Sequence, residues 1–161
     1  MTLERRDYYV GPGESLWEKA PYPGKVMNLL VGFKQSLGAY SLVKYVSTEP
    51  NSTHTHALDD ESAYLLEGEL SVEVGDTMYD LEPGGFVYMP RRVPHRFIPH
   101  GPVVALSIQT PGGVFDALLE DIGSYLAEGK PMSNEKYVEL QLKHGVDAPD
   151  GWSRYPGQPE D

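Results

Sequence analysis

The stretch His54-x-His56-x4-Glu61-x6-Gly68 decides how this chain is interpreted, together with His95 further along the sequence. Alternate side chains of an extended strand share a face, so His54 and His56 are expected to point the same way. Two imidazoles and a carboxylate that converge on one point form a metal site with open coordination positions. His95, arriving from a distant strand, is the expected fourth ligand. The alternative is a solvated polar turn with incidental histidines, but four potential ligands that fit one spacing rule favour the metal site.

A second pattern, Gly84-x5-Pro90-x-Arg92-x2-His95, contains the last of these ligands. Together the two patterns resemble the paired motifs of the cupin superfamily, in which two antiparallel hairpins of a β-barrel contribute ligands to a single metal. The resemblance implies one divalent metal ion per chain. The ligands that it implies are His54, His56, Glu61 and His95.

The chain departs from the family pattern at three positions that are not ligands. Thr48 stands where the first motif usually has glycine. Arg92 replaces the middle glycine of the second motif, and Pro99 replaces its terminal asparagine. These departures concern the geometry of turns and the rim of a pocket, and they leave the metal prediction in place.

Composition excludes several classes of protein. The chain has 161 residues, 23% of them charged and 40% hydrophobic, which is typical of one globular domain. It has no cysteine, so disulfides and thiolate metal sites are excluded. A net charge of −11 argues against nucleic acid or an anionic membrane as a partner. No apolar signal segment is present at 1–10, so a cytoplasmic location is expected.

Short runs rich in β-branched and aromatic residues predict an all-β domain. The expected strands are 27–33, 39–46, 62–66, 69–74, 77–81, 85–89, 95–98 and 103–109. Eight short strands at this spacing imply an antiparallel jelly-roll barrel, which is the cupin double-stranded β-helix. We expect an irregular N-terminal arm at 1–25, the barrel at 26–110, C-terminal helices at 111–147 and an irregular tail at 148–161.

Beyond Gly112 and Gly113 the apolar spacing becomes helical. One face is expected to be apolar and to contain Val114, Leu118, Leu119, Ile122, Tyr125 and Leu126. A second helix is predicted at 134–144, with Ser133 as its N-cap and Gly145 at its C-terminal end. Such short helices must pack on the barrel or on a second subunit, and on this ground a homodimer is expected.

The junction after the barrel extends the resemblance. The single barrel, the 110–115 junction and the closing segment Lys143-His144-Gly145-Val146 resemble bacterial one-barrel relatives of quercetin 2,3-dioxygenase. That resemblance implies a dioxygenase.

Three neutral imidazoles and one carboxylate around a divalent cation leave a residual positive charge of about one unit, which attracts an oxyanion. Fe, Ni, Co and Mn suit this arrangement, and Zn suits a version without redox chemistry. Glu61 has a second expected role as the catalytic base, if it leaves the metal to accept a proton from a substrate hydroxyl.

Strand parity predicts the pocket walls. Ala63 and Leu65 share the face of Glu61, and Phe97 shares the face of His95. Further candidates for an aromatic substrate surface are Tyr40 or Tyr45, Tyr64, Met89 and Phe33. Core packing is the alternative for each of these residues.

Other polar and aromatic residues carry weaker predictions. His100 is expected at the surface and His144 at a helix end, where a cation suits the helix dipole. Arg91 and Arg92 either grip an anionic substrate or form surface ion pairs. Trp17 and Trp152 are expected to cover apolar surface or a subunit interface.

Three functions are consistent with these features. The leading hypothesis is a metal-dependent dioxygenase that cleaves a C–C bond of a phenolic or enolic aromatic substrate, with that substrate and O2 as partners. The alternative is a non-redox, metal-dependent polyketide cyclase or isomerase. A small-molecule-binding protein without turnover is the third.

Overall fold

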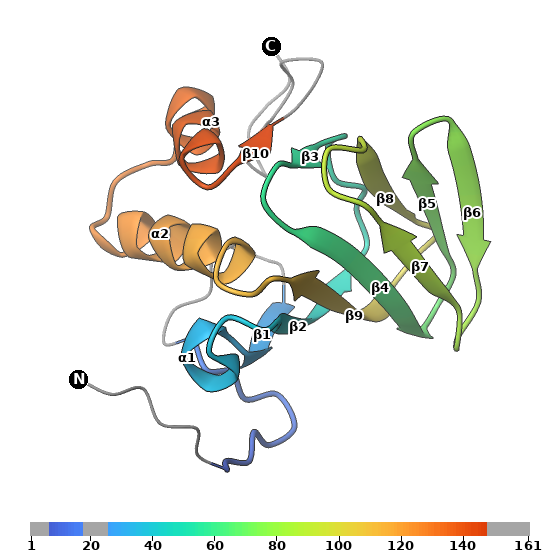
Figure 1. Cartoon of the computed structure of the whole chain (residues 1–161), viewed down its shortest axis with the longest axis horizontal. Helices are drawn as coiled ribbons and strands as arrows, with labels where there is room; N and C mark the ends of the chain where they lie inside the picture. Colours follow the sequence, from blue (N-terminus) through green and yellow to red (C-terminus); the bar gives the residue numbers. More distant parts are fainter. Residues whose placement is uncertain (1–6, 18–25, 148–161) are drawn as a thin grey trace.

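The computed structural model describes residues 7–17 and 26–147 (Figure 1). The strands are β1 (Val26–Val31), β2 (Ser41–Ser47), β3 (Thr55–His56), β4 (Asp60–Glu67), β5 (Leu70–Val74), β6 (Thr77–Leu81), β7 (Phe86–Met89), β8 (His95–Pro99), β9 (Val103–Thr110) and β10 (Val146–Asp147). The helices are α1 (Phe33–Ser36), α2 (Phe115–Ala127) and α3 (Asn134–Lys143).

Two antiparallel sheets form the barrel. A five-stranded sheet has the order β1-β2-β9-β4-β7, and a three-stranded sheet has the order β6-β5-β8. Alternate residues of each strand point inward, so the two inner faces bury one apolar cluster. Its members are Ala63, Leu65, Leu70, Val72, Leu81, Val87, Met89, Phe97, Val103 and Ala105. The mostly-β jelly-roll prediction is confirmed, as are the two C-terminal helices.

Gly68 closes the first motif for a steric reason. Its φ is +90°, and a Cβ built there would lie 2.3 Å from the carbonyl oxygen of Pro102. A residue with a side chain would be strained at this φ and would clash with Pro102, so the turn between β4 and β5 requires glycine.

The first predicted strand is partly wrong. β1 ends at Val31, and Phe33 begins the short helix α1 instead of ending the strand. The side chain of Gln35 accepts a hydrogen bond from the backbone N–H of Gly32 at 3.1 Å, which stabilises the helix start. The next strand begins at Ser41, two residues later than expected, and β4 begins at Asp60, two residues earlier.

The C-terminal helices cover an extension of the barrel's inner face (Figure 1). Their buried residues pack with Leu29 of β1 and Val43 of β2, and Trp17 joins the same cluster. Ser133 accepts a hydrogen bond from the N–H of Lys136 at 3.1 Å, which confirms the predicted N-cap. The helices therefore use their apolar faces within the chain itself.

After α3 the chain returns to the barrel and adds a strand to it. β10 pairs with β3, and Val146 lies opposite His56. The backbone N–H of Ala57 also donates to the carbonyl of Gly145 at 2.7 Å. The C-terminal segment is thus attached to the strand that contains a predicted metal ligand.

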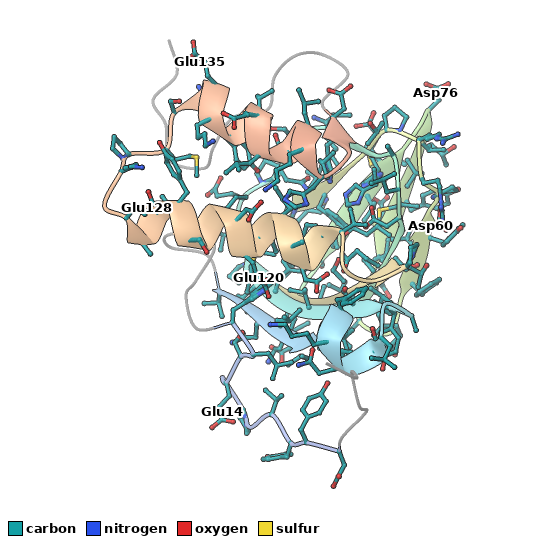
Figure 2. All side chains as sticks on the ribbon, turned by 60° about the vertical axis from the view of Figure 1, so that its left-hand side comes forward. Glu14, Asp60, Asp76, Glu120, Glu128 and Glu135 are labelled. Carbon is teal, nitrogen blue, oxygen red and sulfur yellow. The ribbon has the colours of Figure 1, made fainter. Side chains whose placement is uncertain are left out.

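Residues 7–17 of the expected N-terminal arm form turns and irregular backbone. The rest of that arm, the predicted tail and Trp152 lie outside the described residues. Carboxylates such as Glu14, Asp76, Glu128 and Glu135 project from the periphery (Figure 2). Within the described ranges, every helix is too short or too polar to cross a membrane.

Candidate metal centre

Three separate elements bring the four predicted ligands together. His54 precedes β3, His56 ends β3, Glu61 is the second residue of β4 and His95 begins β8. The backbones of His54 and His95 exchange two hydrogen bonds, with N···O distances of 3.0 and 2.9 Å. This bridge fixes the two motifs against each other.

One ligand atom from each of the four residues lies within 4.8 Å of the other three. The Nε2 atoms of His95 and His56 are 3.2 and 3.5 Å from Oε2 of Glu61. His56, Glu61 and His95 are buried. The predicted ligand set is therefore assembled as one compact group.

The Nδ1 atoms of the three histidines have partners that leave Nε2 facing the centre. Nδ1 of His54 lies 2.9 Å from the carbonyl oxygen of Ser52, and Nδ1 of His95 lies 3.0 Å from that of Val93. Nδ1 of His56 lies 3.1 Å from the carboxylate of Asp59. These oxygens accept hydrogen bonds, so Nδ1 holds the proton and Nε2 presents a lone pair.

An imidazole nitrogen that faces a carboxylate is stabilised when a proton or a metal ion lies between the two atoms. Nε2 of His56 is buried and makes no hydrogen bond among the described residues. Ligand atoms about 2.1 Å from one ion lie about 3.0 Å apart at right angles and about 3.4 Å apart at a tetrahedral angle. The spacings of 3.2 and 3.5 Å from Glu61 match this range. The residues therefore fit a divalent metal ion.

Electrostatics within the group keep Glu61 charged and His54 neutral. Without a metal ion, Nε2 of His95 can carry a proton and donate it to Glu61 at 3.2 Å. Burial alone would raise the pKa of Glu61, but that hydrogen bond and the charges of the histidines lower it to about 2. Burial, with repulsion from His95 and His56, lowers the pKa of His54 to about 3. Burial would also lower the pKa of His56, but its hydrogen bond with Asp59 and the charge of Glu61 together raise it.

Residues 42–109 match the sequence model of a family described as Cupin domain. The fold is a cupin fold. KdgF from Halomonas sp. superposes with a TM-score of 0.51 at 18% identity, covering 56% of this chain and 82% of that one. At this identity the likeness concerns the fold alone.

Two other solved structures resemble this chain with lower TM-scores. TT1209 from Thermus thermophilus has 27% identity and a TM-score of 0.44, covering 46% of this chain and 74% of that one. The DMSP lyase DddQ from Ruegeria pomeroyi has 22% identity and a TM-score of 0.48, covering 53% and 46%. No curated protein matches the chain.

The cupin barrel also contains polar side chains that sequence reasoning missed. The hydroxyl of Ser107 on β9 donates to Oε1 of Glu61 at 2.5 Å. Nε2 of Gln109 donates to Oγ of Ser107 at 2.5 Å and lies 3.4 Å from Oε1 of Glu61. Both residues are buried. Ser107 and Gln109 are two residues apart on β9 and therefore share one face of the strand. This spacing was the signal in the sequence that could have identified them.

Four of the predicted pocket residues lie inside the barrel. Ala63, Leu65, Met89 and Phe97 belong to its buried cluster. Tyr45 packs against that cluster, with its ring centroid 5.9 Å from that of Phe97. Burial and the nearby charge of Glu61 raise the pKa of Tyr45. Contact of these residues with a substrate remains a prediction.

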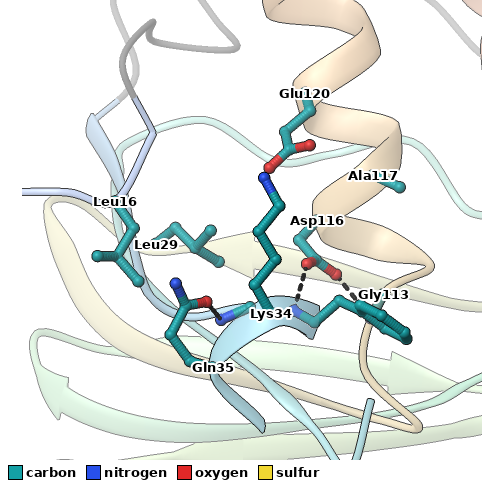
Figure 3. Close-up of a pocket in the computed structure, with 10 residues that line it drawn as sticks. Leu16, Leu29, Lys34, Gln35, Gly113, Asp116, Ala117 and Glu120 are labelled. Atoms are coloured by element: carbon teal, nitrogen blue, oxygen red, sulfur yellow. Dashed lines mark hydrogen bonds between the residues drawn. The ribbon is translucent and has the colours of Figure 1, made fainter. Parts of the chain in front are cut away.

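The other three predicted pocket residues lie elsewhere, and one of them, Tyr64 on β4, is 38% exposed. Phe33 is half-exposed on α1 and lines a separate hollow of about 440 Å³ between α1, β1 and α2 (Figure 3). Asp116 at its edge accepts hydrogen bonds from the backbone N–H of Phe33 at 2.9 Å and from Ser41 at 2.7 Å. Tyr40 is 41% exposed ahead of β2. The rings of Phe33 and Tyr40 do not belong to the barrel's buried cluster, because α1 begins at Phe33, where a strand was expected to end, and β2 begins only at Ser41.

Phe115 is a neighbour of the metal centre that sequence reasoning did not select. It begins α2, and its ring centroid is 6.0 Å from that of His56. A residue so close to His56 borders the centre on the helix side.

The remaining polar residues are ordinary surface groups. Nε and Nη2 of Arg91 donate to the two carboxylate oxygens of Asp60 at 3.0 and 2.9 Å. Of the two roles expected for Arg91, the structure therefore shows the surface ion pair. His100 is exposed and lies 2.6 Å from Oγ of Ser71. His144 caps α3 and lies 2.7 Å from Asp121. The surface and helix-end predictions for the two histidines are confirmed.

Proposed function

We propose that this cupin is a metal-dependent enzyme whose substrate binds the metal through an oxyanion. The observation that carries the proposal is the convergence of three Nε2 lone pairs and one carboxylate oxygen on a single buried point. A cluster with this geometry binds a divalent cation more readily than it remains a structural polar core.

A divalent ion held by His54, His56, Glu61 and His95 would act as a Lewis acid that lowers the pKa of a bound hydroxyl. The imidazoles are neutral donors, so the single charge of Glu61 leaves the centre with net positive charge. Ser107 keeps Oε1 of Glu61 occupied, which orients Oε2 toward the histidines. Phe115 and the apolar barrel residues limit the access of water.

The finer proposal is a dioxygenase acting on a phenolic or enolic aromatic compound. It is supported by a donor set that suits Fe, Ni, Co or Mn and by the apolar barrel interior beside the ligands. The oxygen chemistry itself rests on the resemblance to one-barrel relatives of quercetin 2,3-dioxygenase.

A second candidate is a non-redox lyase, isomerase or cyclase. The hydrogen-bonded group of Glu61, Ser107 and Gln109 favours it, because these donors keep Glu61 ionised and in place, and an ionised carboxylate beside the metal can accept a proton from a substrate hydroxyl. Zn would be no less suitable for this chemistry than a redox metal.

One experiment separates these candidates. Apo-protein is reconstituted separately with Fe(II), Ni(II), Mn(II) and Zn(II), and O2 uptake is measured against flavonols and polyhydroxynaphthalenes. Metal-dependent O2 uptake with Fe, Ni or Mn supports the dioxygenase. Product formation without O2 uptake, sustained by Zn, supports the non-redox enzyme.

The matched variant for both arms is Glu61→Gln, which keeps size and an oxygen donor but removes the charge. Turnover should fall much more than substrate affinity if Glu61 accepts a proton. Metal binding without turnover of any substrate would leave the binding-protein alternative.

A further inference from the structure

Gln109 has a hydrogen-bonding atom that the metal centre itself does not use. Val103, Ala105, Ser107 and Gln109 alternate along β9 and are all buried, and Gln109 lies opposite Glu61 of β4. The Oε1 atom of Gln109 makes no hydrogen bond among the described residues. A buried amide oxygen costs free energy unless it accepts a hydrogen bond, so a donor from outside the protein chain belongs beside it.

The orientation of this amide follows from the order of the hydrogen bonds. The carboxylate of Glu61 is ionised and accepts only, so the hydroxyl of Ser107 donates to it. That hydroxyl has one proton, so towards Gln109, at 2.5 Å, it must accept. Only the nitrogen of an amide can donate, and Nε2 of Gln109 therefore faces Ser107. Oε1 faces away from Ser107 and offers an acceptor.

Tyr45 contains a second buried polar atom of the barrel that makes no hydrogen bond within the described part of the chain. A hydroxyl can donate or accept, so this group suits many ligands and discriminates little between them. The amide oxygen of Gln109 accepts only, and a carbonyl or carboxylate oxygen of a ligand would be repelled by it. Gln109 therefore determines which polar group of a ligand can lie beside it, and that group is a donor.

The charges of the barrel restrict the ligand further. Among the described residues, no lysine or arginine is buried. Arg96 of β8, for example, pairs with Glu73 on the outward face of its sheet. A ligand with a carboxylate in addition to its metal-bound oxyanion would bury a second negative charge without a cation beside it, which is costly. The interior therefore suits a ligand whose second polar group is neutral.

We infer that Gln109 selects a substrate with a neutral hydroxyl next to the oxygen that binds the metal. The first oxygen loses its proton, whereas the second hydroxyl keeps its proton and donates a hydrogen bond to Oε1 of Gln109. The substrate class is a polyhydroxylated aromatic or enolic compound, and a simple phenol lacks the group that Gln109 recognises. The inference rests on the proposed function, because the first oxygen needs the metal.

The test compares ligands that differ by one hydrogen-bond donor. Protein loaded with Zn(II), which has no redox chemistry, is titrated by calorimetry with 2,3- and 1,8-dihydroxynaphthalene and with the monomethyl ether of each. The ether keeps the metal-binding hydroxyl and the second oxygen, but this second oxygen cannot donate. At least one diol should bind about tenfold or more tightly than its ether, because the ether leaves Oε1 of Gln109 unpaired.

The ratio of the two dissociation constants isolates the role of Gln109. Gln109→Met keeps the length of the side chain and removes the acceptor, so the ratio should fall to within about threefold of one. An effect of this variant on the metal or on Ser107 changes both affinities and cancels in the ratio. Gln141→Met alters a buried glutamine of α3 and should keep the wild-type ratio. Circular dichroism and metal content confirm that each variant is folded.

A crystal structure of the wild-type protein with the preferred diol provides a measurement that needs no variant. It should place the second hydroxyl within hydrogen-bond distance of Oε1 of Gln109. An ordered water in that place, with the ligand hydroxyl elsewhere, would overturn the inference.

The outcomes also separate this inference from the proposed function. Equal affinities for each diol and its ether, or a wild-type ratio in Gln109→Met, would overturn the inference alone. If neither diols nor ethers bound the metal, the metal-bound oxyanion of the proposed function would fail together with the inference. Binding that depends on Gln109 without turnover by any metal form would support the inference and contradict the proposed enzyme.

Discussion

Ser107 donates a 2.5 Å hydrogen bond to Oε1 of Glu61, while Oε2 of the same carboxylate faces His56 and His95. The two oxygens therefore have different tasks. One is fixed by β9, and the other is available to a metal ion. This arrangement orients the carboxylate before any ion binds, which lowers the cost of assembling the centre.

Replacing Ser107 with alanine should weaken metal binding by about tenfold, because outer hydrogen bonds of this kind orient ligands. The measurement is a competition titration with a chromophoric chelator. Ser47→Ala is the control, since the Ser47 hydroxyl bonds to the carbonyl of Glu49 instead of a ligand. Equal affinity in Ser107→Ala and wild type would contradict the orienting role.

Tyr45 provides a test of the barrel interior. Its hydroxyl is buried and makes no hydrogen bond among the described residues. Tyr45→Phe should therefore leave the free energy of unfolding unchanged or raise it, because it removes an unsatisfied polar group. Turnover should fall if that hydroxyl instead contacts the substrate. Urea unfolding and kcat/KM measure the two effects, with Tyr64→Phe on the outward face as control.

The pH dependence of the metal-free protein follows from His54. Its folded pKa is about 3, below the ordinary value of 6.5, so the unfolded chain binds more protons between these two values. Stability from this group is present above pH 6.5 and is lost as the pH falls toward 3. Urea unfolding across this range should show that the free energy of unfolding falls with decreasing pH. The variant His54→Gln should reduce the slope of that dependence. An unchanged slope in the variant would exclude His54 as its source.

Arg92 adopts a left-handed backbone, with φ of +66°, and its N–H donates to the carbonyl of His56 at 2.7 Å. Glycine pays no Cβ penalty in this conformation, so Arg92→Gly should be more stable than Arg92→Ala by about 1 kcal/mol. At Arg91 the φ is not positive, and the order should reverse, with alanine the more stable. Urea unfolding gives the free energy of unfolding of the glycine and alanine variants at each position. If the same residue were the more stable at both positions, the backbone argument would be contradicted.

The ligands could be predicted from sequence because they follow local spacing. His54, His56 and Glu61 occupy one short segment, and His95 belongs to a second recognisable pattern. Arg92 retains the backbone conformation that the family pattern assigns to glycine, so this departure preserves the turn. Short β-rich runs between glycine and proline turns were sufficient to indicate the jelly roll.

Features that depend on distant contacts were not predictable. Ser107 and Gln109 read as ordinary strand residues until β9 is placed beside β4. β10 contains two residues, and its pairing with His56 depends on how α3 packs. Phe33 looked like the end of a strand because aromatic residues favour strands, whereas the hydrogen bond between Gly32 and Gln35 starts α1 at this point.

The central claim is that His54, His56, Glu61 and His95 bind one divalent ion per chain. Its most direct test is the metal content of purified protein after reconstitution and dialysis, measured by mass spectrometry for wild type, His56→Ala and the surface variant His100→Ala. The account predicts one ion per chain in wild type and in His100→Ala, and almost none in His56→Ala. Full metal content in His56→Ala would contradict it.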